Sequence, residues 1–334
     1  MKKKILFIAT GGTFSAIKSA EGLKPHFLSK ELLNFFPEAK KIADIDSLQF
    51  FHLDSTNIHP RHWTDLAKKI FENYSKYDGF VIGHGTDTMH YSAAAIFFAL
   101  PNNKKPIVFT GSTFSLEEKN SDAKQNFLNS LKVVTNDKIK EVCICFQRKI
   151  IKGTRANKIL NEATKILNKE LEVFTSINEK FIGEIIDEKI VINKNYSFPK
   201  ISKNQLDLKN NFDTNIGYIK LYPGIESNIL DFFQDKKAII IEAFAVGNIP
   251  FDYSDWLNQI KKFKEKGIPI FITTQNRFGE VDMELYEVGQ KAMKAGAISC
   301  GNILPETVVV KLMWILGNFP NSDVDEIKKL FVTI

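Results

Sequence analysis

A short threonine and glycine segment near the start of the chain could carry a nucleophile. It reads Thr10-Gly11-Gly12-Thr13 and directly follows an apolar run at residues 5–9. Paired glycines let the backbone turn sharply and let a ligand approach closely. A threonine hydroxyl is a weak nucleophile unless a base removes its proton. The segment fits a nucleophile-bearing turn, although a strand-to-helix turn with a hydroxyl cap has the same pattern.

A second polar segment, His84-Gly85-Thr86-Asp87-Thr88, follows the apolar run 79–83 and precedes an alanine-rich helical stretch. Helix N-termini expose N–H groups and partial positive charge, which suits a carboxylate ligand. Thr86 adds a second hydroxyl and Asp87 adds a carboxylate. Asp87 alone also fits an ordinary N-cap, but that explanation accounts less well for the whole pentapeptide.

The elements that must position these segments alternate between short apolar runs and amphipathic stretches. Strands are expected at residues 5–9, 47–53, 79–83, 107–110 and 141–146, and helices at residues 29–36, 60–74, 89–100 and 122–135. Apolar strands that alternate with helices predict a mostly parallel sheet with helices on both faces. Right-handed crossovers put the carboxyl ends of such strands on one edge, where ligands bind in open α/β sheets. Both polar segments are expected at that edge.

A second, smaller α/β domain is expected toward the C-terminus. The alternation weakens between residues 182 and 212, with a short hairpin at residues 185–192, and then resumes. Further strands are expected at residues 216–221, 238–243 and 269–273, and helices at residues 226–234, 253–266, 283–295, 306–316 and 324–332. We therefore expect an N-terminal catalytic domain at residues 1–190, a linker at 191–213 and a C-terminal domain at 214–334.

Charge and composition favour a partner that is neither nucleic acid nor membrane. The net charge is +6, but the lysines are spread along the 334 residues, as on a solvated surface. The N-terminal apolar run is too short for a signal peptide, and no segment approaches the length of a membrane span.

Cysteine usage points to a reducing compartment. Cys143 and Cys145 lie two apart in an apolar run, where their Cα atoms would be about 7 Å apart on a strand, too far for an easy disulfide. Together with Cys300, they are expected to be buried thiols in a cytoplasmic protein. The chain has no Cys/His cluster with the spacing of metal ligands, so we expect no structural metal.

The two polar segments together make the chain resemble type I L-asparaginases, the cytoplasmic branch of the asparaginase–glutaminase family. The resemblance covers nearly the whole chain. Further matches follow in fixed order: Asp54-Ser55-Thr56, Thr110-Gly111-Ser112, Glu118-Lys119-Asn120-Ser121-Asp122, Gly153-Thr154-Arg155-Ala156-Asn157-Lys158, Tyr222-Pro223-Gly224, Val246-Gly247-Asn248, Thr273-Thr274-Gln275 and Lys311-Leu312-Met313-Trp314. The resemblance implies a two-domain asparaginase-like α/β fold. It also implies hydrolysis of L-asparagine to L-aspartate and ammonia, without a metal or organic cofactor.

The catalytic roles of that family carry over to four positions. Thr13 matches the nucleophile that forms an acyl-enzyme, while Thr86, Asp87 and Lys158 match the second catalytic group. There, the Lys158 ammonium would keep Asp87 ionised and polarise Thr86, which could activate Thr13 or the hydrolytic water. His84 lies in the second segment but is expected to be structural rather than a base.

The substrate-binding positions also carry over. Ser55 and Thr56 match substrate contacts, Asp87 would also face the α-ammonium group, and the backbone around Ser112 would join Thr86 in donating to the oxyanion. The remaining binding positions implied are Gly12, Asp54, Gly85 and Asn248. Asn248 matches a position that a neighbouring subunit contributes, which implies a homodimer or homotetramer.

One departure from the family pattern lies beside the nucleophile. The tyrosine that the family carries on the loop after the first motif falls at Leu23, and no tyrosine precedes Tyr74. Leucine has no hydroxyl with which to hydrogen-bond Thr13. Lesser departures, at positions where the family has other residues, are Asn57, Ala245, Asn302 and Leu304.

Three hypotheses follow from this departure. The chain is a working asparaginase whose loop closes in another way, with His26 as a polar group; or an amidohydrolase with a shifted substrate preference; or a binding or regulatory relative that turns over poorly. The four matched catalytic residues argue against the third. Relatives that act on glutaminyl-tRNA precursors carry an extra N-terminal domain, and the position of Thr10 leads us to expect none here.

Overall fold

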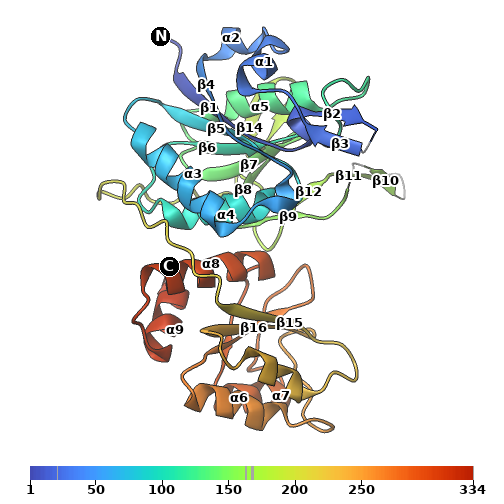
Figure 1. Ribbon diagram of the computed structural model, residues 1–334, viewed down its shortest axis with the longest axis vertical. Helices are drawn as coiled ribbons and strands as arrows, with labels where there is room; N and C mark the ends of the chain where they lie inside the picture. The colour runs from blue at the N-terminus through green and yellow to red at the C-terminus, as the bar shows by residue number, and fades with distance from the viewer. Residues whose placement is uncertain (21, 162–163, 167–168, 334) are drawn as a thin grey trace. The chain divides into compact units, whose positions relative to one another are not determined.

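An eight-stranded mixed sheet forms the centre of the first of two units (Figure 1). The computed structural model describes residues 1–20, 22–161, 164–166 and 169–333, and its units are Met1–Asn210 and Asn211–Ile334. The sheet has the order β14-β13-β8-β7-β6-β5-β1-β4. Its strands are β1 (Lys4–Gly11), β4 (Asp44–Leu53), β5 (Gly79–Gly83), β6 (Ile107–Thr110), β7 (Val142–Phe146), β8 (Lys149–Lys152), β13 (Gly183–Ile186) and β14 (Lys189–Ile192).

The five strands from β4 to β7 are parallel, which confirms the mostly parallel sheet. The other three strands extend it with antiparallel pairs, and of these only the β13–β14 hairpin was expected. The chain reverses after β7 through Gln147, whose φ of 52° is left-handed. A reversal that tight leaves no room for a crossover helix, so the next strand must be antiparallel.

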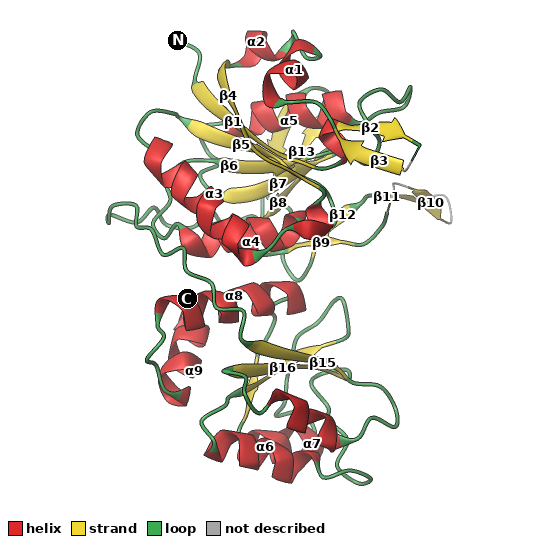
Figure 2. Cartoon of the chain, in the orientation of Figure 1, coloured by secondary structure: helices red, strands yellow, loops and turns green. Residues whose placement is uncertain are grey.

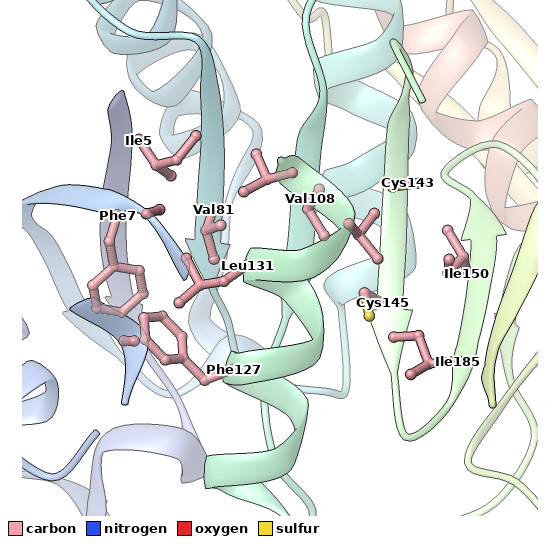
Figure 3. Close-up of a cluster of buried hydrophobic side chains, with 14 of the residues drawn as sticks. Ile5, Phe7, Val81, Val108, Phe127, Leu131, Cys143, Cys145, Ile150 and Ile185 are labelled. Atoms are coloured by element: carbon pink, nitrogen blue, oxygen red, sulfur yellow. The ribbon is translucent and has the colours of Figure 1, made fainter. Parts of the chain in front are cut away.

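Helices cover both faces of this sheet (Figures 1 and 2). They are α1 (Ser29–Asn34), α2 (Ala39–Ile42), α3 (Pro60–Asn73), α4 (Met89–Ala99) and α5 (Ala123–Val134). Figure 3 shows Phe127 and Leu131 of α5 over Phe7 and Val81 of the sheet, and the Phe7 and Phe127 rings lie 5.0 Å apart. Because side chains alternate along a strand, the neighbouring positions face α3 and α4, where Tyr74 stacks on Phe80.

The second unit is built on the four-stranded parallel sheet β15-β16-β17-β18. Its strands are β15 (Ile216–Lys220), β16 (Ala238–Ala243), β17 (Ile270–Thr274) and β18 (Ala297–Ser299). Its helices are α6 (Trp256–Glu265), α7 (Glu287–Ala295), α8 (Pro305–Asn318) and α9 (Val324–Thr333), with a 3₁₀ helix at Ser227–Phe233 where an α-helix was expected. The smaller α/β domain is therefore confirmed.

Short elements lie outside the first unit's eight-stranded sheet. They are the 3₁₀ helices Thr13–Ser15 and Ser55–Asn57, and the strands β2 (Ala16–Ser19), β3 (Gly22–Pro25), β9 (Ala156–Lys158), β10 (Thr164–Ile166), β11 (Lys169–Leu171) and β12 (Phe174–Ser176). Among the described residues, no helix is both long and apolar enough to cross a membrane. The three cysteines are buried free thiols, as expected.

Candidate active site

The two threonine turns meet through their glycines. Strands β1 and β5 are parallel neighbours with Ala9 opposite Gly83, so the turns that follow them lie side by side, as expected. Gly12 has a φ of +77°, and a Cβ on it would lie 2.3 Å from the Cα of Gly85. Both the conformation and the close approach exclude a side chain at Gly12.

The turn that follows β4 packs against the same place. A Cβ on Gly85 would lie 2.6 Å from Ser55 Oγ, and Thr88 Oγ1 donates to the Ser55 carbonyl at 2.8 Å. Asp54 Oδ1 accepts bonds from both Thr56 N and Thr56 Oγ1 at 2.8 Å. Asp54 thus caps the 3₁₀ turn, which holds Ser55 buried and Thr56 exposed.

The turn after β6 brings Ser112 to this edge. Ser112 is buried, and its Oγ has no hydrogen-bond partner among the described residues. Two side chains of the following segment hold the turn in place: Asp122 accepts from Thr113 N at 2.9 Å, and Asn126 Nδ2 donates to the Gly111 carbonyl at 2.9 Å. The turn is therefore anchored from α5, and the buried Ser112 hydroxyl has no part in that anchoring.

Lys158 reaches the second threonine motif from the short strand β9, which pairs with β12. Its Nζ donates to Thr86 Oγ1 at 2.9 Å and to Asp87 Oδ1 at 2.6 Å. The side chain of Asp87 is 51% exposed and that of Lys158 only 14%. Exposed ion pairs add little stability, about 0–1 kcal/mol. The main consequence of this arrangement is that the Lys158 Nζ lies against the Thr86 hydroxyl.

Thr13 begins the 3₁₀ turn directly after Gly12 and is partly buried. Within the described ranges its hydroxyl has no hydrogen-bond partner, whereas Ser15 Oγ is bonded to the Gly12 carbonyl at 3.1 Å. The β2–β3 hairpin follows, with the Leu23 backbone opposite Lys18. His26 N returns to the Ser15 carbonyl at 2.8 Å, so the hairpin that carries Leu23 starts and ends next to the Thr13 turn.

Asn248 belongs to the second unit, where it forms an isolated antiparallel β-bridge with Phe244. Its Oδ1 is buried and unbonded among the described residues. The bridge encloses Ala245, whose φ of 43° is unusual for a residue with a Cβ. Its contribution to a neighbouring subunit stays a prediction.

His84 is fully buried, and burial lowers its pKa to about 4. It is therefore a neutral, structural histidine rather than a base that titrates near neutral pH. Sequence reasoning missed its partner Ser92 and the anchor Asn126. A polar residue at a core-facing helix position was the available signal, because buried polar groups require partners. No group of three metal-ligating side chains occurs in the part of the chain that the structure describes.

Comparison with known proteins matches both units. Residues 4–198 match the family model for the asparaginase N-terminal domain, and residues 215–331 match that for the glutaminase/asparaginase C-terminal domain. The chain is 32% identical over 330 residues to an L-asparaginase of Thermococcus kodakarensis, covering 98% of this chain and 96% of the relative. It is 32% identical over 337 residues to a glutamyl-tRNA(Gln) amidotransferase component of Methanobrevibacter smithii, covering 98% and 75%.

Solved structures of L-asparaginases match the chain over nearly its whole length. The thermostable L-asparaginase from Thermococcus kodakarensis superposes with a TM-score of 0.87 at 30% identity, over 98% of this chain and 96% of that one. L-asparaginase I from Vibrio cholerae gives 0.87 at 29% identity, over 100% and 98%. The match of both units, in fold and in sequence, shows that the chain belongs to the asparaginase family of amidohydrolases.

Proposed function

We propose that the chain hydrolyses L-asparagine to L-aspartate and ammonia through an acyl-enzyme on Thr13. The observation that carries this proposal is that the Lys158 ammonium donates hydrogen bonds to Thr86 Oγ1 and to Asp87. The turn that carries Thr86 also packs against the turn that carries Thr13, through Gly85 and Gly12. The similarity to L-asparaginases supports the choice of substrate.

In the first step, Thr13 Oγ bonds to the side-chain amide carbon and loses its proton. Thr86, polarised by Lys158, takes part in that transfer, and the proton reaches the departing nitrogen so that ammonia leaves as the C–N bond breaks. Water then attacks the ester carbon, passes a proton back to Thr13 Oγ, and releases L-aspartate. The backbone around Ser112 and the Thr86 turn would donate to the oxyanion in both steps.

The substrate's charged groups would find complementary partners at this edge. Asp87 Oδ1 is engaged by Lys158, and the exposed remainder of the carboxylate is available to an α-ammonium group. Ser55 and Thr56 lie beside the N-terminus of α4, which suits an α-carboxylate. Gly12 and Gly85 let the substrate approach the backbone, and Asp54 holds Thr56 in position.

The experiment that tests the proposal is ammonia release from L-asparagine, D-asparagine, L-glutamine and short amide analogues. We expect release from L-asparagine, and weaker or no release from L-glutamine. If ammonia appears faster from another amide, the chain is an amidohydrolase with a shifted preference. If none is released at millimolar substrate while calorimetry detects bound L-aspartate, the chain is a binding relative.

A second candidate function comes from the comparisons. Relatives from Methanobrevibacter smithii and Pyrococcus abyssi, each 32% identical, are components of a glutamyl-tRNA(Gln) amidotransferase, and this chain spans 75% of each. The chain would then be the amidase component of such an enzyme. Ammonia release by the purified chain alone, unchanged by added tRNA, favours the first function, and release that requires tRNA and a partner favours the second.

We also propose that the chain works as a homodimer or homotetramer in the cytoplasm. Asn248 supports this, because its unbonded Oδ1 matches a group that family members lend to a neighbouring subunit. Sedimentation equilibrium measures the subunit number directly.

A further inference from the structure

A buried chain of hydrogen bonds leads from α3 to the backbone of the second threonine motif. Trp63 Nε1 donates to Ser92 Oγ at 2.9 Å, and Ser92 Oγ lies 2.9 Å from His84 Nε2. On the other side of the ring, His84 Nδ1 lies 2.7 Å from the Gly85 carbonyl oxygen. Trp63, Ser92 and His84 are 6%, 0% and 1% exposed, so water does not compete for these bonds.

The direction of every bond in this chain is fixed by its two ends. An indole N–H can only donate, and a carbonyl oxygen can only accept. The single proton of the neutral imidazole must therefore sit on Nδ1, facing the Gly85 carbonyl, and Nε2 must accept. Ser92 then accepts from Trp63 and donates to His84. Burial keeps the pKa of His84 at about 4, which leaves the ring neutral at neutral pH.

The bond to Gly85 orients the peptide that links Gly85 to Thr86. The described chain has no cis peptide bond, and in a trans peptide the C=O and N–H groups point in opposite directions. Since the carbonyl is held toward the buried imidazole, the Thr86 N–H is aimed away from it. No described residue accepts a hydrogen bond from this N–H. Glycine also permits many backbone conformations, so the peptide could rotate without the bond from His84.

We propose that Trp63, Ser92 and His84 are positioning residues that aim the Thr86 amide N–H at the oxyanion formed during amide hydrolysis. The inference rests on the proposed function of the Thr13 site. A hydrogen-bond donor aimed at the oxyanion meets negative charge only as that charge develops during the reaction. It therefore lowers the energy of the transition state and not that of the bound substrate. Loss of its orientation therefore lowers kcat and leaves substrate binding nearly unchanged.

The test uses Ser92→Ala, which breaks the chain at its centre, and Trp63→Phe, which removes only the outer donor. We expect kcat for L-asparagine to fall roughly tenfold or more in Ser92→Ala, with KM and the Kd of L-aspartate within about twofold. Trp63→Phe should lose less, because Ser92 can still donate to His84. Ser92→Thr keeps the hydroxyl and should recover kcat.

The matched control is Ser130→Ala, a fully buried serine of α5 whose Oγ bonds to the Phe127 carbonyl at 2.7 Å. It should lower the melting temperature without changing kcat. If Ser92→Ala and Trp63→Phe lower the melting temperature as Ser130→Ala does and keep wild-type kcat, the positioning role is wrong. If Ser92→Ala does not fold, Trp63→Phe decides alone, because a wild-type kcat in that variant overturns the proposal.

The two proposals fail in different ways. Wild-type protein that releases no ammonia from any amide contradicts the proposed function itself. Active wild-type protein with unaffected variants contradicts only the positioning role.

Discussion

Lys158 is the central residue of the proposed mechanism, because its Nζ bonds both the Thr86 hydroxyl and the Asp87 carboxylate of the second threonine motif. It lies 71 residues from Asp87 along the chain, in a strand of three residues. Such a strand is too short to show a helical or strand pattern in the sequence. A lysine in a polar turn is usually solvated, so the residues around it did not predict its contact with Thr86. Only the match of the whole segment to a family did so.

Replacing this lysine should separate catalysis from stability. Lys158→Met keeps the aliphatic length and removes the ammonium, so we expect kcat for L-asparagine to fall about 100-fold or more. The melting temperature should change little, because the ion pair with Asp87 is half exposed. Lys124→Met, which breaks a surface pair with Glu38, is the control. A Lys158→Met enzyme that keeps wild-type kcat would remove Lys158 from the mechanism.

Leu23 offers a gain-of-function prediction. Leu23→Tyr restores the hydroxyl that the family carries beside the nucleophile, and we expect steady-state assays to give a higher rate on L-asparagine. Lys24→Tyr, one residue further along β3, controls for an added aromatic ring. An unchanged rate in Leu23→Tyr would mean that another group already does the work of the tyrosine.

At the scale of elements, the parallel half of the main sheet and the β13–β14 hairpin were predictable, whereas the antiparallel strand β8 and its pairing were not. Strands β1, β5, β6 and β7 are buried on both faces and read as continuous apolar runs. The strands beyond them are four residues long and partly exposed. The pairing of β8 with β7 depends on a left-handed turn at Gln147, a residue type that seldom signals one.

The anchor of the turn after β6 also belongs to this scale. Asn126 bonds the Gly111 carbonyl and accepts from Gln147 N at 2.8 Å, so it ties the turn that carries Ser112 to the reversal after β7. Asn126→Ala leaves the buried Gly111 carbonyl and the half-buried Gln147 N–H without this partner, which should cost about 2–4 kcal/mol of unfolding free energy. Urea denaturation measures the loss, with the exposed Gln125→Ala as the control. A loss below that of Gln125→Ala would show that Asn126 is not an anchor.

At the scale of the whole molecule, the two-domain organisation followed from the alternation of strands and helices and from its weakening after residue 182. The helix expected at 226–234 is a 3₁₀ helix, Ser227–Phe233. The proposed contribution of Asn248 to a neighbouring subunit, by contrast, has no counterpart in any local pattern. A contact between subunits depends on surfaces far apart in the sequence.

The pH dependence of stability is a property of the whole fold. The direction of the His84 contribution to it follows from the lowered pKa of this histidine. Its pKa is about 4 when buried and 6.5 when exposed, so unfolding takes up a proton between these values. Its contribution is therefore complete above pH 6.5 and is lost as the pH falls toward 4. Burial raises the pKa of Asp122 and Glu141, and these carboxyls act with the opposite sign.

Comparing His84→Gln with the wild type separates the contribution of the histidine to the pH dependence of stability from that of those carboxyls. We expect the melting temperature of the wild type to fall more steeply than that of the variant between pH 6.5 and 4. Parallel curves would contradict a neutral, buried His84.

The measurement that tests the central claim most directly is ammonia release from L-asparagine by the wild type and by Thr13→Ala. The control is Thr135→Ala, which deletes a threonine hydroxyl bonded to the Leu131 carbonyl in α5. We expect release by the wild type and Thr135→Ala, and none above the uncatalysed rate by a folded Thr13→Ala. Wild-type release by Thr13→Ala would contradict the acyl-enzyme on Thr13.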